Sequence, residues 1–175
     1  MAKLGVGDQA PGFELESIDG DKISLSSFSG RKLVILFGRY FGCPVCQLDF
    51  DELCLNIDRI KEKAELIFFT QSSQESARSY CSSKELGFTV IPVPKVGNGY
   101  KVYDDYGVGN MGLGTTIEIL RKAGEAKKLG KVHGDNEGKE MQSPADFVVD
   151  ETGKVIWAHR GLTDIGELLG FLNGL

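Results

Sequence analysis

The chain has 175 residues, of which 41% are hydrophobic and 26% charged, and its formal net charge is −5. This length predicts one domain, residues 1–175, with a hydrophobic core of its own. The negative charge argues against a general nucleic-acid-binding protein, and the lack of an apolar run of ~18 residues argues against a membrane span. The start of the chain has no apolar export segment, so a cytoplasmic location is expected.

Apolar periodicity and turn signals predict, in chain order, a hairpin and then a strand–helix–strand unit. Asp19-Gly20 is the turn signal of the hairpin, and the apolar run Leu33 to Phe37 is typical of a central strand buried on both faces. The helix of the unit carries apolar residues three and four positions apart up to about Ile60, and its crossover makes the flanking strands parallel. The four predicted strands lie near residues 13–15, 23–25, 33–37 and 66–69.

The second half of the chain predicts further helices and a C-terminal hairpin. Gly107 to Gln142 is the least regular part, and an irregular stretch of this length is expected to fold over the functional site. The expected helices lie at residues 73–86, 100–106, 115–122 and 165–172, and the expected strands at 89–93, 146–149 and 154–158. The whole pattern predicts an α/β fold of the thioredoxin-like plan, with a central mixed β-sheet flanked by helices and an N-terminal β-hairpin.

The stretch RYFGCPVCQ, residues 39–47, places two cysteines between the central strand and the following helix. A thiol at a helix N-terminus faces free backbone N–H groups and the positive end of the helix dipole, which lower its pKa. Cys43 is therefore the candidate nucleophile. Cys46, one helical turn further on, is the candidate resolving thiol, because it can attack a mixed disulfide that the first cysteine forms.

Two other interpretations of this pair stay open, namely two inert buried thiols or half of a zinc site. A structural zinc site needs four ligands, and the remaining cysteines and histidines are scattered along the chain. We therefore expect no metal and no cofactor. Cys54 and Cys81 fall on apolar helix faces and are expected in the core, with participation of either one in resolving Cys43 as the alternative.

Four more residues are candidates for substrate binding or activation. Arg39 precedes the first cysteine. It either has a role in the site, by lowering the thiol pKa or by binding an anionic substrate, or is a surface arginine. Tyr40 either donates a hydrogen bond or packs. Ser143 and Pro144 precede a late strand, where a proline is either edge punctuation or a cis proline.

Three further features have plainer interpretations. His133 is expected to be exposed, and His159 is expected to be structural. A basic cluster is interpreted as a solvated helix face, with docking of an acidic partner as the alternative. The cluster comprises Arg121, Lys122, Lys127, Lys128 and Lys131.

Three segments together resemble the peroxiredoxin-like (AhpC/TSA, redoxin) family of the thioredoxin-like superfamily. The opening GDQAPGFELESIDGDKISLSSFSGRKLVILF is similar to the N-terminal part of that family, and RYFGCPVCQ is similar to a Gly-Cys-Pro-x-Cys motif that follows its first core strand. The tail SPADFVVDETGKVIWAHRG is similar to the proline–strand–turn–strand segment of thioredoxin-like folds.

The resemblance implies that Cys43 attacks a peroxide or a disulfide and that Cys46 is its partner in a redox-active disulfide. An external dithiol reductant, such as a thioredoxin-like protein, would restore the thiols. Pro144 would be a cis proline beside the cysteines, with Ser143 presenting its backbone to a substrate. Typical members carry a threonine or serine three residues before the nucleophile, where this chain has Tyr40, so Arg39 and Tyr40 are the candidates to replace the usual activating groups.

Three hypotheses from different classes follow. The first is an antioxidant thiol peroxidase that uses Cys43 and Cys46. The second is a thioredoxin-like thiol–disulfide reductase or redox sensor without peroxidase activity. The third is a non-catalytic binding module or a metal-binding protein of the same fold. The sequence leaves the oligomeric state open, including a homodimer.

Overall fold

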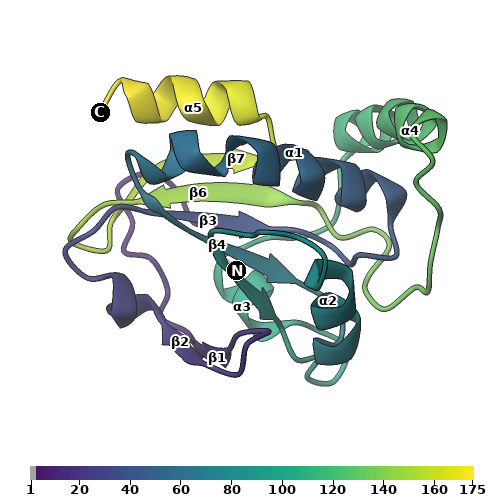
Figure 1. Cartoon of the computed structure of the whole chain (residues 1–175). Helices are drawn as coiled ribbons and strands as arrows, with labels where there is room; N and C mark the ends of the chain where they lie inside the picture. Colours follow the sequence, from purple (N-terminus) through teal and green to yellow (C-terminus); the bar gives the residue numbers. More distant parts are fainter. Residues whose placement is uncertain (1–2) are drawn as a thin grey trace.

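The computed structural model describes residues 3–175, and its centre is a five-stranded sheet of mixed direction (Figure 1). Its strands are β3 (Leu33–Phe37), β4 (Glu65–Thr70), β5 (Thr89–Pro92), β6 (Ala145–Val149) and β7 (Val155–Arg160). Their order across the sheet is β5-β4-β3-β6-β7. β4 pairs in parallel with both β3 and β5, whereas β6 pairs antiparallel with both β3 and β7. The central position of β3 puts the residues that follow it at the middle of one sheet edge.

β3 separates two apolar cores, because successive side chains of a strand point to opposite faces. Val34 and Leu36 face one core, and Ile35 and Phe37 face the other. All residues of β3 are at most 1% exposed. This double burial explains why the strand is a continuous apolar run without polar alternation.

Three helices cover the first face of the sheet, namely α1 (Pro44–Lys61), α2 (Gln74–Cys81) and α5 (Ile165–Asn173) (Figure 1). α1 packs through a stripe of residues spaced three and four apart, which includes Phe50, Leu53, Ile57 and Ile60. Burial of each such side chain is worth about 1.5–3 kcal/mol relative to exposure. The stripe fixes α1 against the sheet and so fixes the direction of its N-terminal end.

The opposite face is covered by α3 (Lys101–Asp105) and by the N-terminal hairpin. The hairpin consists of β1 (Glu14–Glu16) and β2 (Lys22–Ser24), followed by the 3-10 helix η1 (Leu25–Phe28). Three buried tyrosines around α3 fill this second core, and their hydroxyls donate to backbone carbonyls. They are Tyr100, Tyr103 and Tyr106.

One more helix, α4 (Leu113–Lys128), packs beside the N-terminal end of α1 rather than on the sheet (Figure 1). Residues 129–142 lead from α4 back to β6 without regular structure. This part of the chain is the irregular segment of the sequence, and the expectation that it contains a helix is confirmed, although that helix is longer at both ends than predicted. No helix within residues 3–175 is both long and apolar enough to cross a bilayer.

The predicted thioredoxin-like fold is confirmed, including the N-terminal hairpin and the mixed sheet. A further error in element length concerns α2, which ends at Cys81 rather than near Leu86. Lys84 N donates to the carbonyl of Cys81, so the chain turns after the helix. The turn lets Leu86 and Phe88 pack against the first core before β5 begins.

Candidate active site

Both cysteines of the RYFGCPVCQ stretch lie at the start of α1 and are free thiols. Cys43 is the N-cap residue, with Pro44 in the first helical turn, where a missing N–H costs no hydrogen bond. Cys43 N donates to the carbonyl of Tyr40 at 3.1 Å, which closes a tight turn between β3 and the helix. Cys43 is 4% exposed and Cys46 is 7% exposed. The chain thus places two buried thiols one helical turn apart.

The guanidinium of Arg39 lies against the sulfur of Cys43. Its Nη2 donates to Cys43 Sγ at 2.6 Å, and its Nη1 donates to the carbonyl of Glu140 at 2.6 Å. The backbone carbonyl of Arg39 accepts from Thr70 Oγ1 and from Gln71 N, so both ends of the residue are fixed. Arg39 is only 7% exposed, and its Nε is buried without a hydrogen-bond partner within residues 3–175. The alternative of a surface arginine is therefore wrong.

The two thiols have opposite pKa shifts. A hydrogen bond from Cys46, the positive charge of Arg39 and the N–H groups of Val45 and Cys46 lower the pKa of Cys43 to about 5, although burial opposes the shift. The pKa of Cys46 lies well above its usual value, because Cys46 donates to Cys43, is buried and faces the negative charge of that thiolate. Near neutral pH, Cys43 is the thiolate and Cys46 is the thiol.

Side chains from α4 and from the loop before α5 cover the two thiols. Ile119 and Ala123 of α4, together with Leu162, pack against a small cluster that includes Tyr40 and both cysteines. Tyr40 is 2% exposed, so it packs in the wall of the site. Burial is also the main reason that the pKa of Tyr40 is raised. The expectation that the irregular segment folds over the site is confirmed.

The chain after α4 crosses directly over the residue that precedes Cys43. Gly134 N donates to the carbonyl of Gly42 at 2.9 Å. A Cβ added at Gly42 would lie 2.1 Å from the carbonyl oxygen of Asp135, so only glycine fits under this crossing. Gln47 Nε2 donates to the carbonyls of Phe41 and Val132, which joins the same crossing to the first turns of α1.

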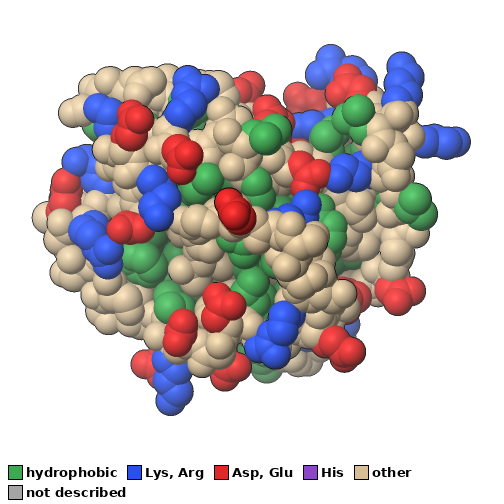
Figure 2. Space-filling view, in the orientation of Figure 1, with side chains coloured by type: hydrophobic (Ala, Val, Ile, Leu, Met, Phe, Trp, Pro, Cys, Tyr) green, Lys and Arg blue, Asp and Glu red, His purple; other side chains and the backbone are tan. Residues whose placement is uncertain are grey.

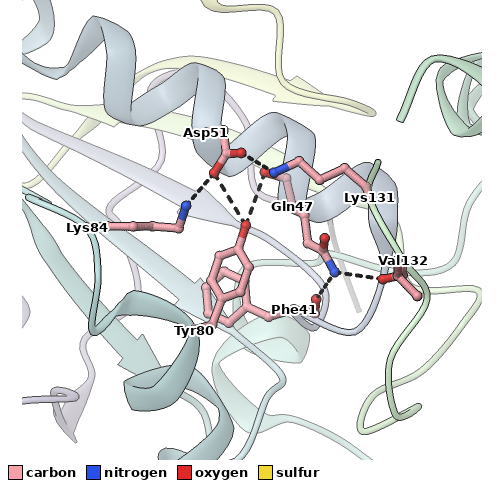
Figure 3. A network of polar contacts seen from close by, with 7 residues as sticks. All are labelled: Phe41, Gln47, Asp51, Tyr80, Lys84, Lys131 and Val132. Atoms are coloured by element: carbon pink, nitrogen blue, oxygen red, sulfur yellow. Dashed lines mark hydrogen bonds and ion pairs between the residues drawn. The ribbon is translucent and has the colours of Figure 1, made fainter. Parts of the chain in front are cut away.

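A polar network one turn further along α1 holds this segment in place (Figure 3). The carboxylate of Asp51 accepts from Lys131 and, at 2.7 Å, from Lys84. Tyr80 OH donates weakly to Asp51 and to the carbonyl of Gln47, both at 3.4 Å. Although burial works in the other direction, hydrogen bonds from Lys131 and Lys84 lower the pKa of Asp51. The network ties α1, α2 and the segment after α4 together beside the thiols.

The structure differs at Ser143 and Pro144 from two details implied by the resemblance, namely the cis peptide bond and a free backbone N–H. Within residues 3–175 no peptide bond is cis, so the expected cis proline at Pro144 is wrong. Ser143 N donates to the carbonyl of Gly109, and the carbonyl of Pro144 accepts from Gly161 N. These bonds hold the stretch extended as it enters β6 and leave the Ser143 N–H occupied rather than free for a substrate. Pro144 still lies at the sheet edge of Arg39, because the adjacent Ala145 pairs with Phe37.

The other cysteines and histidines lie away from the two thiols or serve the fold. Cys81 is buried in the first core, as expected, whereas Cys54 is partly buried and packs against the edge of that core. His133 is exposed, also as expected, and its ring lies edge-on to that of Tyr40 at 6.5 Å. His159 Nδ1 lies 3.2 Å from the carboxylate of Asp146, a fully buried group on β6.

Sequence reasoning missed the residues that hold Arg39 and cover the thiols. Gln71 and Gln142 are buried and hydrogen-bonded to each other at 3.1 Å, and Gln71 Oε1 accepts from Lys139 N. They tie the segment that carries Glu140 to the end of β4. The sequence signal for them is a polar residue directly after the apolar run of β4 and another at the end of the irregular segment. Such a signal is weak, because the sequence does not show which buried groups these two side chains contact.

No group of three or more histidine, cysteine, aspartate or glutamate side chains within residues 3–175 has the arrangement of a metal site. The donor set near Cys43 and Cys46 contains a buried arginine, and a cation disfavours binding of a second cation at the same place. The arrangement is instead suited to thiolate chemistry, because it places an activated thiolate, Cys43, beside a protonated thiol, Cys46, that can react with it after oxidation.

A low-pKa cysteine and a second thiol at a helix start, on a thioredoxin-like sheet, define the class of thiol-dependent oxidoreductases. The chain belongs to the AhpC/TSA family, whose sequence profile matches residues 6–158. It is 29% identical over 136 residues to a protein assigned as a peroxiredoxin Bcp in Helicobacter pylori, covering 73% of this chain and 88% of that protein.

One further relative and one solved structure are also similar to the chain. Peroxiredoxin Bcp of Escherichia coli K12 is 26% identical over 92 residues, which cover 52% of this chain and 59% of that protein. The crystal structure of a peroxiredoxin-like protein from Aquifex aeolicus superposes with a TM-score of 0.69 at 16% identity, covering 99% of this chain and 89% of that one. At this identity the structural likeness supports the fold.

Proposed function

We propose that the protein is a thiol peroxidase that reduces peroxides through a redox cycle of Cys43 and Cys46. The observation that carries the proposal is the contact between Arg39 Nη2 and Cys43 Sγ at the start of α1. Together with the hydrogen bond from Cys46, that contact stabilises the thiolate near neutral pH, and the pKa of Cys43 is about 5. Membership of the AhpC/TSA family and the similarity to peroxiredoxins named Bcp support peroxide as the oxidant.

In the first step, the thiolate of Cys43 attacks one oxygen of the peroxide, and the O–O bond breaks. Cys43 becomes a sulfenic acid, and the other oxygen leaves as water or an alcohol after taking a proton. The buried Nε of Arg39 has no protein partner among residues 3–175, so it is a candidate donor to a peroxide oxygen. Arg39 would thus serve both the thiolate and the breaking bond, in a region where typical family members use a threonine or serine.

In the second step, Cys46 attacks the sulfur of the sulfenic acid, water leaves, and a disulfide forms. Before oxidation, the hydrogen bond to Cys43, burial and the negative charge of Cys43 raise the pKa of Cys46, and Arg39 lowers it. Oxidation of Cys43 removes the negative charge and leaves Arg39 facing Cys46. Formation of the sulfenic acid therefore activates the resolving thiol at the moment it is needed.

In the third step, an external dithiol returns the disulfide to two thiols and is itself oxidised to a disulfide. One of its thiolates forms a mixed disulfide with the protein, and its second thiol releases the protein thiol. We also propose that this cycle runs in the cytoplasm, where a dithiol pool keeps thiols reduced. The closed surroundings of Cys43 favour small peroxides, because Ile119 and Leu162 pack over the thiol cluster.

A coupled assay tests the proposal. Purified protein is mixed with hydrogen peroxide, thioredoxin, thioredoxin reductase and NADPH, and peroxide loss is followed for the wild type and for Cys43→Ser and Cys46→Ser. We expect no turnover with Cys43→Ser, and we expect Cys46→Ser to stop after one oxidation of Cys43. The matched control is Cys54→Ser, which removes a thiol on the same helix and is expected to retain full activity.

The same assay has two outcomes that contradict the proposal. Full peroxide turnover by Cys43→Ser would remove Cys43 from the reaction. Rapid reduction of insulin disulfides by the wild type without loss of peroxide would favour a thiol–disulfide reductase instead.

A further inference from the structure

α4 exposes large apolar side chains on the surface that faces away from the cysteines. Leu113, Ile117 and Leu120 are 86%, 66% and 69% exposed. Their spacing of four and three residues places them in one row along the helix. Isolated exposed apolar residues are ordinary, but a row of three on one helix marks an interaction surface.

The same face of α4 is positively charged towards its C-terminal end. Arg121, Lys127 and Lys128 are exposed, and helical spacing places them beside the apolar row. The acidic residues of the helix, Glu118 and Glu125, lie on the adjoining side, in a hollow beside the loop before α5 that Arg121 also lines. In Figure 2, Lys and Arg side chains project from the corner where Figure 1 places α4. This basic face stands out on a chain whose net charge is −5.

The opposite side of α4 packs against the thiols. Ile119 and Ala123 contact the cluster that contains Cys43 and Cys46, and Lys122 forms an ion pair with Asp49 of α1. A protein thiol must come within bonding distance of a sulfur in order to reduce a disulfide. Both cysteines lie under α4, so the thiol of a reducing protein has to reach them from beside this helix. A helix with its side chains is only about 10–12 Å across, so the surface of a protein in that position also contacts the outer face of α4.

We propose that the outer face of α4 is the docking surface for an acidic dithiol protein that reduces the Cys43–Cys46 disulfide, an inference that rests on the proposed redox cycle. The apolar row Leu113, Ile117 and Leu120 contacts apolar residues around the partner's cysteines, and the three cations attract its acidic surface. One partner thiolate attacks the disulfide and forms a mixed disulfide. The second partner thiol then attacks the partner's own sulfur, which releases both protein thiols and leaves an oxidised partner.

Charge favours this occupant over a second copy of the chain. Two α4 faces in a symmetric contact would bring two sets of the same three cations together, which is unfavourable. An acidic partner instead meets opposite charge at the only step of the cycle that needs a second protein. A second copy and an anionic membrane are the competing occupants, and both are distinguished by the experiment below.

The test measures one step, reduction of the disulfide, in the full chain. The Cys43–Cys46 disulfide is formed with diamide, without peroxide, and verified by peptide mapping. Its reduction by an acidic thioredoxin is then followed in a single turnover by alkylation of the released thiols. The test variants are Ile117→Asp/Lys127→Glu/Lys128→Glu and the milder Lys127→Glu/Lys128→Glu. Dithiothreitol serves as a small reductant that needs no docking surface.

A control variant carries the same kinds of change in the C-terminal part of α1 and just after it, at positions away from the thiols. It is Leu55→Asp/Lys61→Glu/Lys63→Glu, in which Leu55 is 86% exposed and both lysines are exposed. We expect the α4 triple variant to be reduced by thioredoxin about tenfold more slowly and the double variant to be slowed as well. The control variant should match the wild type, and all proteins should react equally with dithiothreitol. The wild-type rate should also fall as salt rises.

Equal rates of reduction by thioredoxin for the wild type and both α4 variants would overturn the proposal. If those rates are equal while the α4 variants lose self-association in sedimentation, the face is a contact between copies. If the rates are equal while the variants lose binding to anionic vesicles, the face binds membranes. Failure of peroxide turnover, by contrast, would contradict the proposed function and leave this result intact, because the disulfide is made with diamide.

Discussion

Arg39 donates from Nη2 to the sulfur of Cys43 at 2.6 Å, while its Nη1 is held by the carbonyl of Glu140 at the same distance. The cation is therefore fixed on the thiolate by a residue far away in the chain. Loss of the guanidinium removes both a charge and a charge-assisted hydrogen bond from the sulfur.

The first prediction concerns Arg39→Gln. The pKa of Cys43 should rise from about 5 by about 1 to 2, because the neighbouring positive charge is lost. The reaction with peroxide should slow by about 10²-fold, since a donor to the reacting atoms is also lost. The pH dependence of iodoacetamide alkylation gives the pKa, and stopped-flow oxidation gives the rate. Arg31→Gln, an exposed residue paired with Glu65, is the control. An unchanged alkylation profile in Arg39→Gln would contradict this role.

The second prediction separates two substitutions of Cys46. Both Cys46→Ser and Cys46→Ala should stop the cycle at the sulfenic acid, which dimedone traps. Only the alanine removes the hydrogen-bond donor that lowers the pKa of Cys43, so that pKa should rise more in Cys46→Ala than in Cys46→Ser. Alkylation profiles of the two reduced variants measure the difference. Identical profiles would mean that Cys46 does not stabilise the thiolate.

The third prediction tests the crossing of the chain over Gly42. In Gly42→Ala, the new Cβ would collide with the carbonyl oxygen of Asp135, so the segment must move. We expect a loss of about 1–3 kcal/mol in the free energy of unfolding, measured in denaturant. Gly124→Ala is the matched control, because Gly124 lies inside α4 and a Cβ added there would have no neighbouring atom within 4 Å. That variant should gain about 0.5–1 kcal/mol. Equal stability of Gly42→Ala and the wild type would rule out a tight crossing.

The fourth prediction concerns stability against pH at Asp49. Burial raises the pKa of Asp49 to about 6, although the ion pair with Lys122 opposes the shift. A carboxyl with a raised pKa in the folded protein stabilises the fold below its unfolded pKa of ~4, and that contribution is lost as the pH rises through about 6. Relative to Asp49→Asn, the free energy of unfolding of the wild type should therefore fall by on the order of 1–3 kcal/mol as the pH rises from about 4 to about 6. Denaturant unfolding of both proteins across this range measures it. A difference that stays constant with pH would contradict the raised pKa.

The fifth prediction concerns access to Cys43. Ile119 packs over the thiol cluster, so Ile119→Ala should open space and speed oxidation by a bulky hydroperoxide such as cumene hydroperoxide more than oxidation by hydrogen peroxide. Single-turnover oxidation without a reductant measures both rates. Ile117→Ala, two residues away on the exposed face, should leave the ratio unchanged. A ratio that does not change in Ile119→Ala would show that α4 does not limit the size of the substrate.

The local parts of the fold and site could be predicted from the sequence. Continuous apolar residues predicted β3, and spacing of three and four predicted the buried face of α1. The position of Cys43 at a helix start and the spacing to Cys46 are also local, and these features already give the two thiols different surroundings. Such patterns depend only on residues close in sequence, which is why they are readable without a structure.

The tertiary structure alone decided what surrounds the two thiols. Arg39 was ambiguous in the sequence, because its partner Glu140 lies 101 positions further on and offers a backbone carbonyl that no side-chain pattern reveals. The cover formed by Ile119 and Ala123 depends on where α4 packs against α1. The sequence by itself determined where the reactive sulfurs stand. Packing between distant segments determined how deeply they are buried, how Arg39 is held against Cys43, how accessible they are and which face of α4 is exposed.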